Sequence, residues 1–91
     1  MRKRYPFSMR LNGHNIELAY NYLRCKAHDI YTGDAEWDDK IVDEFEELRD
    51  VYARAIHDPV FWATGHEYGI LKRANEWAVN YRDVKNALGR E

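Results

Sequence analysis

The sequence contains few of the residues on which several classes of small protein depend. It has one cysteine, two prolines and five glycines in 91 residues. The single cysteine, Cys25, cannot form an internal disulfide, which excludes a disulfide-rich secreted domain. Few prolines and glycines leave little room for the many tight turns of a β-sandwich. These absences argue against secreted and all-β folds.

Long apolar runs are missing as well. Nowhere do about 18 apolar residues follow one another, so we expect no membrane-spanning helix. Residues 1–10 are charged like the start of a signal peptide but lack the apolar stretch of such peptides. The sequence therefore predicts a cytoplasmic protein that makes no contact with a membrane.

What the sequence does contain is typical of one globular domain. Hydrophobic residues make up 45% of it and charged residues 33%, so we expect a single ordered domain over residues 1–91. A net charge of -2 excludes a wholly basic nucleic-acid binder. The charge is nevertheless uneven, with six basic and two acidic residues in 1–30 and nine acidic and two basic residues in 34–50.

Apolar residues recur at steps of three and four in three segments, which predicts three amphipathic helices. The first runs over about 14–31, with Asn12 and Gly13 before it as capping and turn residues and Gly33 at its end. The second opens at Asp34, a good N-cap, and ends near residue 57. The third runs over about 65–88.

Two start signals precede the third helix. Asp58-Pro59 predicts a short helical turn over 59–63. Thr64 and Glu67 form a capping-box pattern, which predicts the start of the main helix. The expected fold is all-α, a small antiparallel three-helix bundle with a short extra helical turn near residues 59–63.

Basic and aromatic residues interleave in an N-terminal arm, residues 1–11. Such a surface can hold phosphates and stack bases; its candidate residues, extended along the first helix, are Arg2, Lys3, Arg4, Tyr5, Arg10, Arg24 and Lys26. Three other interpretations stay open. The arm is a mobile tail, or it packs Phe7, Met9 and Leu11 onto the helices, or it faces the acidic second helix of its own or another chain.

The turn before the third helix is rich in large side chains. Because Phe61 and Trp62 are neighbours, we expect one to cap the core and the other to cover a nearby surface. Tryptophan and tyrosine are over-represented at binding hot spots. The alternatives are a binding edge and a simple aromatic lid on the core, and the candidate binding residues are His57, Phe61, Trp62, His66 and Tyr68.

Metal and catalytic patterns are incomplete. Residues 47–51, Glu-Leu-Arg-Asp-Val, resemble one half of the magnesium-binding pattern of all-helical nucleotide pyrophosphohydrolases of the MazG type. That family pairs this half with Glu-x-x-Glu on the preceding helix, where this chain offers Glu17 and Asp29. The resemblance therefore implies a nucleotide hydrolase only if a second subunit supplies carboxylates. We assign no catalytic residue, metal ligand or cofactor.

The function expected from the sequence is a small non-enzymatic protein-interaction module that self-associates as a homo-oligomer. Small all-α domains recur among phage and mobile-element proteins that modulate or inhibit host protein complexes. The hypothesis therefore includes a modulator or inhibitor of this type. The main alternative is a binder of a phosphate-bearing ligand, a nucleic acid or small nucleotide, through the basic arm. A metal-dependent nucleotide hydrolase is the remote alternative.

Overall fold

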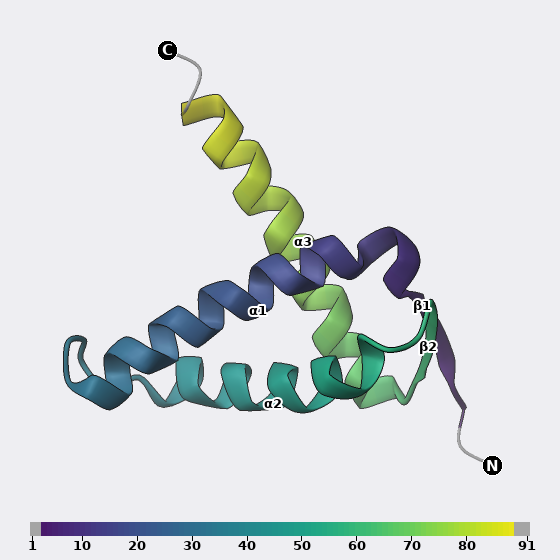
Figure 1. Cartoon of the computed structure of the whole chain (residues 1–91), viewed down its shortest axis with the longest axis horizontal. Coiled ribbons are helices and arrows are strands. Elements are labelled where there is room, and N and C mark those ends of the chain that lie inside the picture. Colours follow the sequence, from purple (N-terminus) through teal and green to yellow (C-terminus); the bar gives the residue numbers. More distant parts are fainter. Residues whose placement is uncertain (1–2, 89–91) are drawn as a thin grey trace.

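The chain forms three helices and two short strands (Figure 1). The computed structural model describes the backbone of residues 3–88 and the side chains of residues 3–82. In chain order the elements are strand β1 (Tyr5–Ser8), helices α1 (Met9–Thr32) and α2 (Asp39–Ala55), strand β2 (Val60–Ala63) and helix α3 (Gly65–Leu88). The described chain is thus mostly helical, with a small two-stranded antiparallel sheet.

Helix α1 begins earlier than its apolar spacing suggests. Ser8 is its N-cap, and the Ser8 hydroxyl accepts a hydrogen bond from the Leu11 backbone N–H at 3.2 Å. Asn12 and Gly13 therefore lie inside the helix, and their predicted role before it is wrong. The predicted end is confirmed, because Gly33 adopts φ 85°, a left-handed conformation that glycine tolerates without steric cost.

Helix α2 begins later than predicted, because the aspartate that caps it is Asp38 and not Asp34. The Asp38 carboxylate accepts hydrogen bonds from the backbone N–H groups of Lys40 at 3.0 Å and Ile41 at 3.4 Å. Trp37 consequently lies outside the helix, where it is 60% exposed and packs against the ring of Tyr31.

A strand replaces the short helical turn predicted over residues 59–63. Strand β2 pairs antiparallel with β1, with Phe7 opposite Phe61 and Pro6 opposite Trp62. The Arg10 backbone N–H extends this connection by donating to the carbonyl of residue 59 at 2.9 Å. Much of the N-terminal arm is thereby an ordered strand rather than a tail, because its backbone groups find partners far along the sequence.

The core is shared by all the elements. Its fully buried large side chains are Ile16 of α1, Leu48 of α2 and Leu71 of α3, and Phe7 and Phe61 cover its end from the sheet. Helices α1 and α2 lie side by side, whereas α3 crosses α1 and projects beyond both (Figure 1). The core therefore lies at one end of α3.

A hydrogen-bond network marks the crossing of α1 and α3. The Asn15 side-chain amide donates to the Asn75 side-chain carbonyl at 2.8 Å, and Arg82 donates to the Asn15 side-chain carbonyl at 2.6 Å. Asn15 thus holds α3 at two points about two helical turns apart.

Two neighbouring residues of β2 provide a test of the sheet. Phe61→Ala should lower the free energy of unfolding by about 3 kcal/mol or more, because it empties a core position. Trp62→Ala should change it by about 0.5 kcal/mol or less, because Trp62 is 59% exposed while Phe61 is 9% exposed. Urea unfolding of the two variants measures both values, and equal losses would contradict the strand assignment.

Candidate functional site

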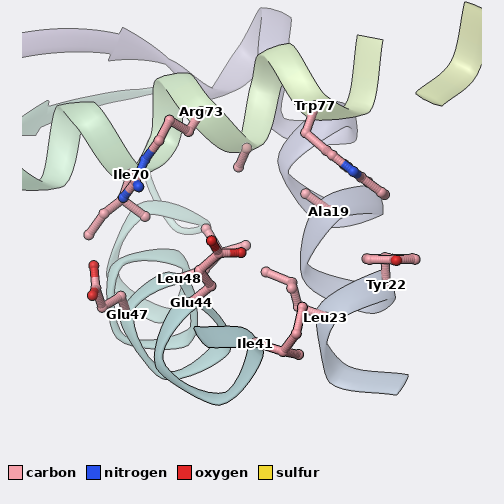
Figure 2. Close-up of a pocket in the computed structure, with 11 residues that line it drawn as sticks. Ala19, Tyr22, Leu23, Ile41, Glu44, Glu47, Leu48, Ile70, Arg73 and Trp77 are labelled. Atoms are coloured by element: carbon pink, nitrogen blue, oxygen red, sulfur yellow. The ribbon is translucent and has the colours of Figure 1, made fainter. Parts of the chain in front are cut away.

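A groove of about 320 Å³ opens between the three helices (Figure 2). Its apolar floor comes from all three, and consists of Ala19, Leu23, Ile41, Leu48, Ile70 and Ala74. Tyr22 and Trp77 stand at one end of the groove, while Glu44, Glu47 and Arg73 lie along its sides.

The groove follows from the direction of α3. Helices α2 and α3 are close near the start of α3, and they diverge as α3 rises across α1 (Figure 1). Side chains from α2 therefore cannot cover the middle of α3. Ala19 and Ala74 line the resulting space with small side chains, which leaves it open.

Three rings form an aromatic wall, defined as Tyr22, Trp77 and Tyr81. The ring centroids of Tyr22 and Trp77 are 4.6 Å apart, and those of Trp77 and Tyr81 are 5.0 Å apart with planes inclined by 13°. Tyr22 is 36% exposed and Tyr81 39% exposed. The Lys26 ammonium lies 5.7 Å from the Tyr22 ring centroid, a cation–π distance. The wall thus continues the groove along α1 and α3.

Charged groups line the groove on both sides. Glu44 and Glu47 project from α2, and the Arg73 side chain extends from α3 toward α2 (Figure 2). The Glu47 carboxylate lies 3.6 Å from His66 Nε2, and this contact becomes an ion pair when the histidine is protonated. The groove therefore has acidic and basic groups beside its apolar floor.

A buried carboxylate fixes the point at which α3 leaves the rest of the fold. Glu67 is 7% exposed. It accepts a hydrogen bond from the Thr64 backbone N–H at 2.9 Å, and its own N–H donates to the Thr64 hydroxyl at 3.2 Å, so the predicted capping box is confirmed. Arg54 of α2 forms an ion pair with the Glu67 carboxylate. Desolvation on its own would raise the pKa of Glu67, but the Thr64 N–H and the Arg54 guanidinium outweigh it and hold the pKa below its ordinary value.

The structure separates the basic residues that the sequence suggested as one phosphate-binding surface. Lys3, Arg4 and Arg10 are exposed near the sheet, whereas Arg24 and Lys26 lie farther along α1. Arg10 and Arg24 are about 21 Å apart along the helix axis, since the rise is about 1.5 Å per residue. Arg2 lies outside the described residues.

The aromatic residues near β2 are divided between the core and the surface. Phe61 is buried, as expected of the ring that caps the core, and Trp62, which was expected to cover a nearby surface, is exposed. Tyr68 packs against Tyr5 and Phe7, with ring centroids 5.3 and 6.3 Å away. The arm's two rings are thus occupied by contacts within the chain.

The histidines of the same stretch are at the surface. His57 and His66 are both exposed. Among residues 3–82 no group of three or more histidine, cysteine or acidic side chains is placed to hold a metal ion. Within the described helices, none is both long enough and apolar enough to cross a membrane.

The aromatic wall was not among the residues singled out from the sequence. Trp77 and Tyr81 belong to the apolar stripe of the third helix, which the periodicity assigns to the core. The predicted bounds gave no signal of a difference in length, because the second helix was expected over about 34–57 and the third over about 65–88. In the structure α2 has 17 residues and α3 has 24, so the shorter helix does not cover the whole stripe of the longer one.

Comparisons of the chain with family models, with curated proteins and with solved structures give no match.

The buried carboxylate predicts how stability depends on pH. Because the folded-state pKa of Glu67 is lowered, its stabilising contribution is complete above the unfolded value of 4.5 and is lost as the pH falls through the folded-state pKa. Glu67→Gln should therefore lower the free energy of unfolding at pH 7 by about 1–3 kcal/mol, since a charged hydrogen bond is lost.

The difference between wild type and variant should shrink as the pH falls below 4.5. Urea unfolding at several pH values between neutrality and acid measures it. Glu46→Gln, an exposed carboxylate on α2, is the control and should show no such trend. A wild type–Glu67→Gln difference that is constant with pH would contradict the role of the Glu67 charge.

Proposed function

We propose that this chain is a non-enzymatic protein-interaction module that binds an apolar helical segment of a protein in the groove. The observation that carries the proposal is an open groove with an apolar floor, continuous with the partly exposed aromatic wall. An amphipathic helix laid into a hydrophobic groove is a recurring mode of peptide recognition.

The chemistry of the groove supports a protein ligand. Tyrosine and tryptophan dominate binding hot spots because a large ring buries much apolar area and loses little conformational entropy. Glu44, Glu47 and Arg73 lie beside an apolar floor, which favours a ligand with an apolar ridge and charges on its flanks. Cys25 is exposed and unpaired, which fits our proposal that the module works in a reducing cytoplasm.

A phosphate-bearing ligand has less support. The basic residues proposed for it are distributed over two regions of the molecule, and the rings of Tyr5 and Phe7 pack against Tyr68. Stacking of bases on these rings would require them to leave Tyr68. We therefore propose the groove, and not the arm, as the binding surface.

Site-specific photo-crosslinking in the source cells tests the proposed binding surface. A benzophenone amino acid at position 22, in the groove, should give a discrete covalent adduct with one protein. The matched control carries the same group at position 62, an exposed aromatic position on the sheet, and should not give that adduct. An adduct formed equally from both positions, or none from position 22, would contradict the proposal.

Trp77→Ala, introduced into the position-22 crosslinking chain, should reduce the adduct about tenfold or more, because truncation of a hot-spot aromatic costs at least about 2 kcal/mol of binding. Circular dichroism establishes that the variant keeps its helices. Trp37→Ala is the matched control, since Trp37 is exposed and lies outside the groove lining. Equal yields from the two variants would show that the aromatic wall does not take part in binding.

A further inference from the structure

Two exposed aromatic rings meet where α1 ends and α2 begins, at the end of the helix pair opposite the sheet (Figure 1). Tyr31 is in the last turn of α1, and Trp37 is in the connection between the two helices. We name these two residues the aromatic pair. Tyr31 is 54% exposed and Trp37 60% exposed. Among the ring contacts of the described residues, this is the only one in which both rings are more than half exposed.

The aromatic pair forms a wedge. The two ring centroids are 5.8 Å apart, and the ring planes are inclined by 56°. A hydrogen bond from the Trp37 indole N–H to the Asp39 carboxylate fixes the orientation of the indole. Because both rings are largely exposed, the wedge is open to solvent, and a carboxylate charge lies at its edge.

The chain around the wedge is strongly acidic. Residues 29–39 contain no lysine or arginine and five acidic residues, which are Asp29, Asp34, Glu36, Asp38 and Asp39. Among the described side chains, the only ion-pair partner of these five is His28, which lies 3.8 Å from Asp29 and is charged only when protonated. The local charge therefore favours a cationic ligand.

The ring faces of the aromatic pair are not used by cations of the chain itself. Within residues 3–82 the cation–π contacts are those of Lys3 with Tyr5, Lys26 with Tyr22 and Arg49 with Phe45. The electron-rich face of an aromatic ring attracts a cation most strongly for tryptophan, and also for tyrosine. The aromatic pair thus offers both kinds of ring to a cation from outside.

We propose that the aromatic pair binds a free quaternary ammonium compound. An unmethylated ammonium group is strongly hydrated and gains little by leaving water for an exposed ring. Methyl groups weaken that hydration and present apolar surface to both rings, while the positive charge is stabilised by the ring faces and by the carboxylate of Asp39. Neither ring belongs to the groove lining, so this site is independent of the function proposed for the groove.

Titration of the full chain with choline, followed by proton–nitrogen NMR at constant ionic strength, tests the proposal. The indole signal of Trp37 should shift and saturate over about 0.1–50 mM, a range suited to a few solvent-exposed contacts. Trp62 is the internal control, because it is 59% exposed but has no ring contact among the described residues. A Trp37 signal that does not saturate, or an equal shift of Trp62, would overturn the proposal.

A neutral ligand of the same shape separates charge from apolar contact. The alcohol in which carbon replaces the nitrogen of choline should bind at least about tenfold more weakly, because it keeps the methyl groups and lacks the charge. Equal affinities would overturn the proposal. A peptide-borne trimethyl-lysine that bound much more tightly than choline would overturn the assignment to a free compound.

Two substitutions at one position test the contribution of the Tyr31 ring. Tyr31→Ala should raise the dissociation constant for choline at least about threefold, since one of the two ring faces is lost. Tyr31→Phe is the matched control, because it keeps the ring and should bind nearly as wild type does. Circular dichroism should show that both variants, which change an exposed side chain, keep their helices. Equal affinities of the two variants would overturn the role of the ring.

Asp39→Asn tests the charge beside the wedge. The asparagine side chain can still accept a hydrogen bond from the Trp37 indole, so the ring keeps its orientation. Choline should bind at least about twofold more weakly to this variant, because the nearby negative charge is removed. The neutral alcohol should bind to the variant and to wild type equally. An unchanged affinity for choline would contradict the electrostatic part of the proposal.

Discussion

The fold depends on how one buried carboxylate is satisfied. Glu67 is charged and nearly inaccessible to water, so it persists there only with partners for its oxygens. Arg54 comes from the end of α2, and Thr64 comes from the residue before α3. These three residues hold together the end of one helix, the turn after β2 and the start of the next helix, and so determine where α3 leaves the core.

Because of this geometry, some apolar side chains next to the core are not covered by another helix. From the corner at Glu67, α3 crosses α1 at Asn15 and Asn75 and moves away from α2. The divergence leaves apolar side chains in the groove without cover from α2. Trp77 stacks on Tyr81 and makes a tilted contact with Tyr22, and these ring contacts offset part of the exposure. The same contacts order the rings, which would lower the entropic cost of the binding proposed for the groove.

Features set by local chemistry could be predicted from the sequence. The steps of three and four identify the three helices, Gly33 ends the first, and the Thr64–Glu67 capping box begins the last. The prediction of Asp34 as the N-cap is wrong because either Asp34 or Asp38 can cap a helix, and the fold decides which one does. Strand β2 could not be predicted because its partner, Tyr5–Ser8, lies more than fifty residues earlier, and no local sequence pattern indicates such a pairing.

The candidate site was less predictable than the fold. Periodicity shows that Trp77 and Tyr81 share an apolar face, but it does not show which element covers that face. That depends on the angle at which α3 crosses α1, and the angle depends on contacts such as Arg54–Glu67 between residues far apart in sequence. The basic residues of the predicted phosphate-binding surface all lie within the first 26 residues of the sequence, yet α1 carries Arg10 and Arg24 to different regions of the surface.

Amide hydrogen exchange at the start of α3, compared between wild type and Glu67→Gln at pH 7, tests most directly whether the Glu67 carboxylate holds this end of the helix. Loss of the charged hydrogen bond and of the ion pair should speed exchange in the first turns of α3, because local opening there then costs less free energy. Exchange in the middle of α1 should not change and provides the internal reference. Equal exchange rates at the start of α3 in the two proteins would contradict the account.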